Sequence, residues 1–148
     1  MESRKLIINN KINQLSLIHG FLEQLGADWL LEPGMIFELN LILEEYISNL
    51  IFYGYPDDAD HVISIEMSKA ERSLTLLVTD DGMKFNILEA PGYEDIEKPV
   101  HERKIGGLGI HFIKSLTDHI EYESDGEKNK LVIVKNIQNS QKKPGGLQ

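Results

Sequence analysis

The strongest constraint on the fold is a helical segment at residues 35–53 that is apolar on most of its sides. A helix on a protein surface needs only one apolar stripe, whereas a helix that is apolar nearly all round is covered by other elements. Pro33 and Gly34 separate it from an amphipathic helix at residues 11–29, whose apolar residues recur mostly at three- and four-residue spacing. We therefore expect two consecutive helices, of which the second is buried.

Short segments with alternating or β-branched composition predict strands at residues 5–9, 61–69, 73–79, 119–123 and 130–135. The second and third of these strands are joined by a short turn and are expected to form an antiparallel hairpin. A third helix is expected from residue 106 to about residue 116, after a long aperiodic loop at residues 86–105. This order of elements predicts an α+β fold. We expect a two-layer α/β sandwich with a mixed, mostly antiparallel sheet and helices on one face.

Length and composition fit one globular domain. The chain has 148 residues, of which 41% are hydrophobic and 26% are charged, as is usual for a domain with its own core. We expect residues 1–138 to form this domain and the polar residues 139–148 to form a disordered tail.

Charge and cysteine content exclude several classes of function. The 15 Lys and Arg residues against 24 Asp and Glu residues give a net charge of −9, which disfavours direct nucleic-acid binding. The absence of cysteine excludes disulfides, thiolate metal sites and a cysteine nucleophile. No apolar run reaches the roughly 18–20 residues that span a bilayer, and the first residues do not resemble a signal peptide. These features predict a cytoplasmic protein without membrane contact.

Glu45 and Asn49 are four residues apart in the predicted buried helix, so they project from the same face. A carboxylate and an amide that are buried cost about several kcal/mol unless they have partners. The pair suits Mg²⁺ and base chemistry, because an amide offers a neutral oxygen to the ion and a carboxylate takes up a proton. From spacing alone, the alternative is that Glu44, Glu45 and Asn49 form the solvated stripe of the helix.

Asp80 and Gly82 follow the strand at residues 73–79. An aspartate at this position can accept a hydrogen bond from an exocyclic amine, and a glycine lets the backbone approach a flat ligand. The alternative interpretation is an ordinary Asp-Gly turn.

Gly106, Gly107 and Gly109 open the third predicted helix. Glycines there expose backbone N–H groups at the positive end of the helix, which favours an anion. The segment lacks the Gly-Lys-Ser/Thr ending of a Walker A loop, and Phe112 stands where a dinucleotide fingerprint needs its third glycine. A flexible helix entry is the alternative.

In this order and separation, the segments resemble the gyrase and histidine-kinase ATPase superfamily, and within it the anti-sigma-factor serine kinases (RsbW-like). The resemblance extends over residues 6–136. Its most specific stretches are LILEEYISNLIFYGYP, LLVTDDGMKFN and IGGLGIHFIKSLTDHIEY. It implies a histidine-kinase-like ATPase fold that uses ATP and Mg²⁺.

The resemblance also implies a role for each candidate residue. Glu45 would be the catalytic base that deprotonates a partner's serine, and Asn49 would hold Mg²⁺ against the phosphates. Asp80 would bond the adenine amine, with Gly82 beneath the ring and Tyr53 lining the same pocket. The residues implied at the phosphates are Arg103, Lys104, Gly107, Leu108 and Gly109, and the loop at residues 86–105 would be the ATP lid. A solvated loop end is the alternative for Arg103 and Lys104.

Two positions depart from the family pattern. Motifs of the family often read Asp-x-Gly-x-Gly, and Lys84 occupies the last of these positions here. Superfamily members usually place a threonine on a late strand to support the adenine-binding aspartate, whereas this sequence has Asn129, Lys130 and Val132 in that region. The second departure predicts weaker adenine affinity or selectivity.

The function implied by the resemblance is a cytoplasmic regulator that phosphorylates a serine on a STAS-type antagonist protein and sequesters a sigma factor. Homodimerisation is implied by the family alone. A non-catalytic interaction module of the same fold is the main alternative. A detached histidine-kinase ATPase domain is less favoured, because the 5 histidines are scattered and His19 lies on the first amphipathic helix.

Overall fold

The computed structural model describes residues 2–89 and 107–137, with the backbone alone for Glu89 and for residues 107–110. Its elements are β1 (Glu2–Asn9), η1 (Ile12–Gln14), α1 (Leu15–Trp29), α2 (Pro33–Tyr53), β2 (Val62–Lys69), β3 (Ser73–Asp80), η2 (Ile87–Glu89), α3 (Gly107–Ser115), β4 (His119–Ser124) and β5 (Asn129–Asn136). Every helix and strand predicted from the sequence is present. The main differences at boundaries are that β1 begins at Glu2, that the first helix opens with the 3₁₀ turn η1, and that α2 begins at Pro33, within the residues expected to separate the two helices. The short helix η2 lies inside the segment predicted as an aperiodic loop.

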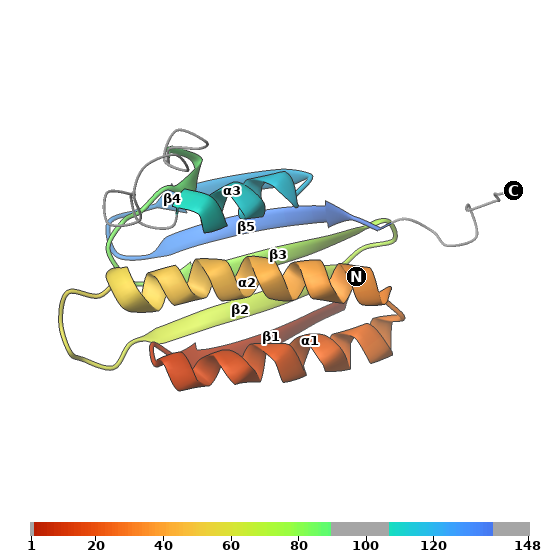
Figure 1. Ribbon diagram of the computed structural model, residues 1–148, viewed down its shortest axis with the longest axis horizontal. Coiled ribbons are helices and arrows are strands. Elements are labelled where there is room, and N and C mark those ends of the chain that lie inside the picture. The colour runs from red at the N-terminus through yellow and green to blue at the C-terminus, as the bar shows by residue number, and fades with distance from the viewer. Residues whose placement is uncertain (1, 90–106, 138–148) are drawn as a thin grey trace, which may run out of the picture.

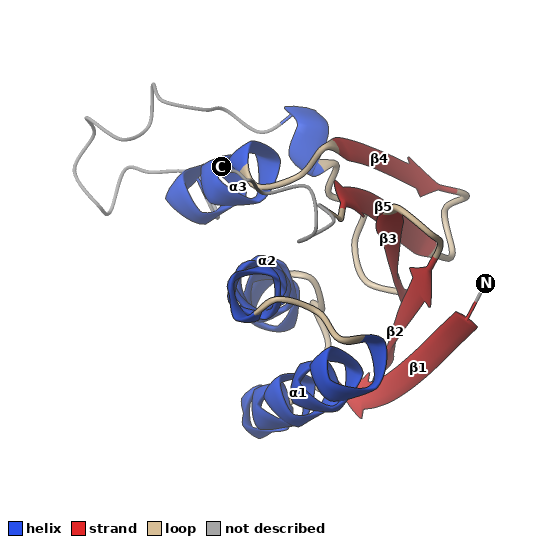
Figure 2. Ribbon diagram, turned by 90° about the vertical axis from the view of Figure 1, so that its right-hand side faces the viewer, coloured by secondary structure: helices blue, strands red, loops and turns tan. Residues whose placement is uncertain are grey.

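The strands form one five-stranded sheet in the order β1-β2-β3-β5-β4. All pairings within the described residues are antiparallel, so the sheet is not mixed there. Figure 2 shows α1, α2 and α3 together on one face of this sheet. The predicted α+β two-layer sandwich is therefore confirmed, and so is the hairpin of β2 and β3.

The core lies between the sheet and its helices. Alternate residues of β3 are buried against the helices, as period-two patterning requires: Leu74, Leu76, Val78 and Asp80. Helix α2 packs between α1 and α3, which explains why so many of its sides are apolar (Figures 1 and 2). The expectation that it is wholly buried is wrong on its outer side, where Phe37 is 69% exposed and Phe52 is 64% exposed.

A buried cation joins β5, α2 and the end of α3. It lies away from the ends of the helices that carry the candidate motifs. Lys135 on β5 is only 5% exposed. Its Nζ donates to Glu38 Oε1 of α2 and to the main-chain oxygen of Leu116, just after α3, both at 2.6 Å. These two acceptors offset the cost of burying the ammonium group, and they attach the end of α3 to α2 and to the sheet.

Three segments meet at one end of the sandwich, on the left of Figure 1: the C-terminal end of α2, the end of β3 and the start of β5. Antiparallel register places Asp80 directly opposite Asn129. No helix formed by residues 2–89 or 107–137 combines the length and apolar character that crossing a membrane requires.

Candidate functional site

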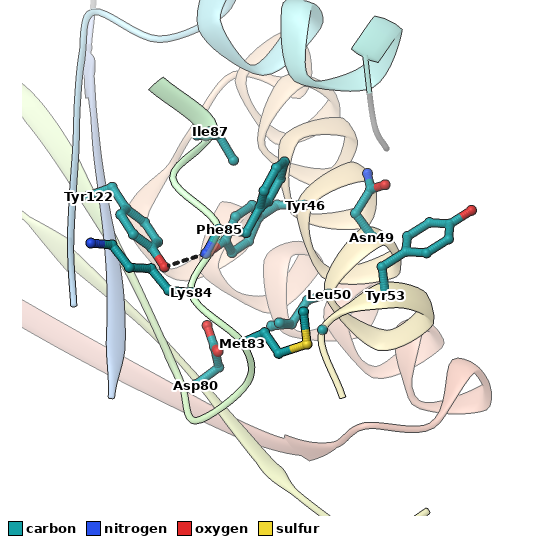
Figure 3. A pocket seen from close by; sticks show the side chains of 11 residues that line it. Tyr46, Asn49, Leu50, Tyr53, Asp80, Met83, Lys84, Phe85, Ile87 and Tyr122 are labelled. Atoms are coloured by element: carbon teal, nitrogen blue, oxygen red, sulfur yellow. Dashed lines mark hydrogen bonds between the residues drawn. The ribbon is translucent and has the colours of Figure 1, made fainter. Parts of the chain in front are cut away.

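A pocket with a volume of about 100 Å³ lies between α2, the segment that follows β3, and β4 (Figure 3). Its walls are mainly apolar and aromatic side chains. The lining residues are Tyr46, Asn49, Leu50, Tyr53, Gly54, Asp80, Met83, Lys84, Phe85, Ile87 and Tyr122. This volume is several times what one water molecule needs, and an apolar wall with a few polar groups is typical of small-molecule sites.

Asp80 is the buried charged residue of this pocket and is only 1% exposed. Its Oδ1 accepts hydrogen bonds from the Gly82 amide at 2.8 Å and from Asn129 Nδ2 at 2.9 Å. Its Oδ2 is buried and has no hydrogen-bond partner among the described residues. An unsatisfied buried acceptor costs about 1–3 kcal/mol. Asp80 therefore offers one unmatched acceptor in a mainly apolar cavity.

The electrostatics of the pocket are governed by this carboxylate. Burial raises the pKa of Asp80, and the hydrogen bonds from Asn129 and Gly82 partly offset this rise. Burial and the neighbouring charge of Asp80 also raise the pKa values of Tyr46 and Tyr55. Both phenols therefore remain protonated at neutral pH and add no negative charge to the cavity.

Two glycines bring the end of α2 close to the segment after β3. A Cβ atom on Gly82 would lie 2.8 Å from the main-chain oxygen of Gly54, so only glycine fits without a shift of the backbone. The Met83 amide donates to that same oxygen at 2.7 Å. A Cβ atom on Gly54 would itself lie 2.6 Å from the main-chain oxygen of Leu50. The floor of the pocket is thus built by direct backbone contact.

Asn49 lines the pocket, and its Nδ2 donates to the main-chain oxygen of Glu45 at 2.7 Å. This bond leaves the amide oxygen of Asn49 available to another partner. Glu45 and Asn49 are half-buried and Glu44 is exposed, so the pair is neither fully buried nor a freely solvated stripe. Glu45 is not among the lining residues.

The structure describes some of the remaining predicted residues and not others. Tyr53 lines the pocket and is 54% exposed. Gly107, Leu108 and Gly109 form the first turn of α3, which packs against α2. Arg103 and Lys104, the loop from residue 90 to residue 106, and the predicted tail at residues 139–148 lie outside the described residues.

Sequence reasoning missed several lining residues. Tyr46, Gly54 and Tyr122 line the pocket and were not among the predicted site residues. The Gly-Tyr-Pro that follows α2 is the signal that marked a tight turn at Gly54. Asn129 was noted only as a departure from a pattern, yet its amide bonds the buried aspartate.

A second polar cluster lies beside the pocket, in the connection between α2 and β2. The ring of His61 stacks on Tyr55 with centroids 4.4 Å apart. His61 Nε2 lies 2.8 Å from Asp57 Oδ1, and Nδ1 lies 3.0 Å from Asp81 Oδ1. His61 thus links this connection to the residue that follows Asp80.

Comparison with known proteins agrees with this geometry. Residues 8–135 match the family described as histidine kinase-like ATPase domain. The chain is 30% identical over 107 residues to the serine-protein kinase RsbW of Bacillus thuringiensis (strain Al Hakam), and equally to those of Bacillus cereus (strain AH820) and Bacillus anthracis. Each match covers 70% of this chain and 66% of the relative, so the chain spans slightly less than two thirds of these relatives.

The family match includes every element that builds the pocket, from α2 through β3 to β5. The resemblance seen in the sequence is therefore confirmed at the level of the family. The chain belongs to the histidine kinase-like ATPase family and, within it, is similar to the RsbW serine-protein kinases.

Proposed function

We propose that this chain binds Mg·ATP in the pocket and transfers the terminal phosphoryl group to a serine of a partner protein. The observation that carries this proposal is the unmatched Oδ2 of Asp80 in a mainly apolar cavity. Adenine presents a flat apolar ring with an exocyclic amine at its edge. An amine that donates to Oδ2 would supply the hydrogen bond that this oxygen lacks.

The surroundings of Asp80 fit a flat base. Gly82 has no side chain, and Met83, Leu50 and Ile87 supply apolar contacts. Burying such a ring contributes about 25 cal/mol for each Å² of apolar surface removed from water. The aspartate then selects the orientation of the base, and the apolar wall supplies affinity.

Asn49 is the proposed ligand for Mg²⁺. Its Nδ2 is bonded to the helix backbone, so its neutral amide oxygen is the atom left for a cation. Mg²⁺ usually takes one or two protein oxygens and completes its shell with phosphates and water. No group of three or more His, Cys, Asp or Glu side chains in the described part of the chain is arranged to hold a metal. When bound, the ion would neutralise charge on the phosphates.

The phosphates are proposed to lie near the first turn of α3. The backbone N–H groups of Gly107, Leu108 and Gly109 are at the positive end of that helix. Arg103 and Lys104 precede this turn in the sequence and are proposed to contact the terminal phosphates.

Glu45 is the proposed general base. In the transfer step, the serine Oγ attacks the γ-phosphorus, the bond to the bridging oxygen of ADP breaks, and the serine proton passes to the Glu45 carboxylate. Glu45 is half-buried and lies one helical turn before Asn49, on the same face of α2. This position suits a group that meets a protein substrate at the mouth of the pocket.

The likeness to RsbW supports a role in transcription regulation. We propose a sigma factor and a STAS-type antagonist as partners, the latter bearing the serine, together with a cytoplasmic location and a homodimeric state. The net charge of −9 favours basic protein surfaces over nucleic acid.

Two measurements test the proposal: calorimetric titration with Mg·ATP, and transfer of radiolabelled phosphate from ATP to a STAS-domain antagonist. Glu45→Gln should keep ATP affinity within about twofold and lower the transfer rate by about 10²–10⁴, the usual contribution of a general base. Glu44→Gln, on the exposed neighbouring position, is the matched control and should retain both properties.

Asn49→Ala should weaken Mg·ATP binding. Unchanged transfer by Glu45→Gln would remove Glu45 from the mechanism, and absence of ATP binding by the native chain would overturn the proposal.

A second candidate function is a non-catalytic module that uses ATP to shape a protein interface. The observation in its favour is that Glu45 is not among the residues that line the pocket. This candidate predicts ATP binding without any transfer to the antagonist, and with equal antagonist affinity for the native chain and for Glu45→Gln.

A further inference from the structure

His61 lies where three segments of the chain meet, immediately before β2. Its amide donates to Asn10 Oδ1 at 2.9 Å, and the Asn10 amide, just after β1, donates to the main-chain oxygen of His61 at 3.1 Å. The ring of His61 stacks on Tyr55, and its side chain is only 17% exposed. These contacts fix the backbone and the ring, and therefore the directions in which the two ring nitrogens point.

The two ring nitrogens of His61 face carboxylates from two different segments. Asp57, in the connection after α2, lies 2.8 Å from Nε2, and Asp81, immediately after β3, lies 3.0 Å from Nδ1. A neutral imidazole has one N–H group and one bare nitrogen, whereas an imidazolium has two N–H groups, and a carboxylate only accepts. A neutral ring would therefore satisfy one carboxylate and set a lone pair against the other. Only the protonated ring can bridge both.

The two segments that His61 bridges also build one wall of the pocket. The connection after α2 begins at Gly54, and the segment after β3 continues to Met83 and Lys84, and all three of these residues line the cavity. The Met83 amide joins the two segments through its bond to the Gly54 oxygen at 2.7 Å. The bridge through His61 is a further link between the same segments, and unlike the backbone bond it depends on a proton.

We propose that His61 is a positioning residue for the nucleotide, whose protonated ring holds these two segments together and whose deprotonation weakens Mg·ATP binding. The inference rests on the proposed function, since it concerns the regulation of the same pocket. His61 acts through Asp57 and Asp81 and is not itself a lining residue.

The charges that face His61 place its titration in a useful range of pH. The pKa of an unperturbed histidine is about 6.5. The hydrogen bond to Asp57 is the largest influence on the pKa of His61 and raises it, desolvation opposes this rise, and Asp81 raises the pKa further. The stacked phenol of Tyr55 adds no charge, because burial raises its own pKa. The link is therefore expected to weaken as pH rises through a value above about 6.5.

Two other charged groups must be separated from this effect. Lys11, which follows Asn10, is paired with Asp60 at 3.2 Å, so its charge is offset. Asp80 titrates in the opposite sense, because its ionised form accepts the hydrogen bond proposed from adenine, so its ionisation strengthens binding as pH rises. A variant of His61 retains Asp80, and the ratio of native to variant affinity therefore isolates the histidine.

The first measurement is the affinity for Mg·ATP by calorimetry from about pH 6 to about pH 8.5. The ratio of native to His61→Gln affinity should fall at least about threefold over this range, the factor that corresponds to half a pKa unit. His61→Arg stays charged, and its guanidinium can donate to both carboxylates. This variant should therefore keep the tighter affinity at the upper end of the range. His19→Gln, in an exposed pair on α1, is the control and should follow the native chain.

Asp81→Asn separates positioning from simple attraction between a cation and the phosphates. Removing a negative charge beside the pocket would strengthen the binding of an anion if charge alone mattered. If the bridge matters, Asp81→Asn should instead bind Mg·ATP more weakly than the native chain, with a smaller dependence on His61.

Linkage provides a second, independent measurement. If protonated His61 favours nucleotide binding, then bound nucleotide must raise the pKa of His61 by the matching amount. An NMR titration of the ring protons should show a rise of at least about half a pKa unit on saturation with Mg·ATP. His19 is the internal control, and its pKa should change by less.

Circular dichroism and thermal melting verify that each variant is folded, and His61→Asn replaces His61→Gln if the latter does not fold. An affinity ratio that stays constant with pH, or a pKa of His61 that Mg·ATP does not raise, overturns the inference and leaves the proposed function intact. Tighter binding by Asp81→Asn also overturns the inference, because charge alone would then explain the pH dependence. A native chain that does not bind Mg·ATP at any pH overturns both.

Discussion

The main-chain oxygen of Gly54 accepts a hydrogen bond from the amide of Met83 at 2.7 Å, which ties the end of α2 to the segment that follows β3. The two residues belong to elements separated by the whole β2–β3 hairpin. Their contact sets how far Asp80 stands from Asn49 on the opposite wall of the pocket. Changes at this backbone contact should therefore affect both stability and nucleotide binding.

Gly82→Ala tests that contact directly. The new Cβ atom would lie 2.8 Å from the Gly54 oxygen, and both groups are held by the backbone. We expect a loss of about 1–3 kcal/mol in the free energy of unfolding, which is typical of overpacking, together with weaker ATP binding. Urea unfolding and calorimetry measure the two effects. An alanine variant with native stability and native ATP affinity would show that the floor of the pocket is more adaptable than its geometry implies.

Gly20→Ala is the matched glycine substitution, far from the pocket. A Cβ atom at Gly20, in the middle of α1, meets nothing within 4 Å. Alanine in a helix interior is favoured over glycine by about 0.5–1 kcal/mol. The free energy of unfolding should therefore rise by about that amount, with unchanged ATP affinity. A fall in the free energy of unfolding would show that a Cβ atom at Gly20 is not accommodated freely.

Glu38→Gln tests the buried ion pair with Lys135. Removing one partner of a buried pair costs about 3–5 kcal/mol, and the cost is smaller here because the Glu38 side chain is 40% exposed. We expect a loss of roughly 1–3 kcal/mol in urea unfolding. The control is Asp60→Asn, which breaks the exposed pair with Lys11 and should cost less than about 1 kcal/mol. Equal effects of the two substitutions would rule out a special role for burial.

His61→Gln tests the cluster beside the pocket through its pH dependence. The hydrogen bond to Asp57 raises the pKa of His61, and the same bond lowers the pKa of Asp57. The contribution of His61 to the stability of the fold is thus complete below its unfolded pKa of about 6.5. This contribution is lost as pH rises through the folded-state pKa of His61. The contribution of Asp57 is present above about pH 3.9 and is lost as pH falls through its lowered pKa.

The difference in melting temperature between the native chain and His61→Gln should therefore be largest between about pH 4 and pH 6.5. It should shrink as pH rises above this window. His19→Gln, on the exposed face of α1, is the control for loss of a histidine. If the difference in melting temperature instead grew from pH 6 to pH 9, the pKa of His61 would not be raised by folding.

Asp80→Asn should separate stability from function. The folded-state pKa of Asp80 is raised by burial, so ionised Asp80 makes the fold less stable as pH rises from about 3.9 through that pKa. An amide avoids this cost, and its oxygen can still accept from Asn129 and Gly82. We expect stability at pH 7 to be unchanged or higher by about 1 kcal/mol, while ATP affinity falls by at least about 100-fold. A variant that is less stable than the native chain by more than about 2 kcal/mol would show that Asp80 has a structural role.

Local patterns predicted much of the fold. The alternation of Leu74, Leu76 and Val78 continues to Asp80, and this phase alone places the carboxylate on the helix-facing side of β3. The apolar character of residues 35–53 likewise predicted a helix covered by neighbours, and α2 lies between α1 and α3. Such features could be predicted because side-chain periodicity depends only on residues close in the chain.

The pocket itself depends on contacts between distant residues, which no local pattern contains. The pairing of Asp80 with Asn129 follows from the register between β3 and β5. The strand that contains Lys135 was predicted, but its bonds to Glu38 and to the main-chain oxygen of Leu116 join residues far apart in the sequence. Glu45 is half-buried, and the burial of one residue depends on neighbouring elements, so spacing along one helix could not reveal it.

The bond between Asn129 and Asp80 spans 49 positions of sequence, and this has a consequence for folding kinetics. Contacts between distant residues form only after loop-closure entropy has been lost, and they slow folding. The cavity therefore cannot exist in a partly folded chain that has formed only the β2–β3 hairpin. A nucleotide that binds this cavity would stabilise the complete sheet against global unfolding, by an amount that grows with the logarithm of its concentration, and would leave earlier intermediates unaffected.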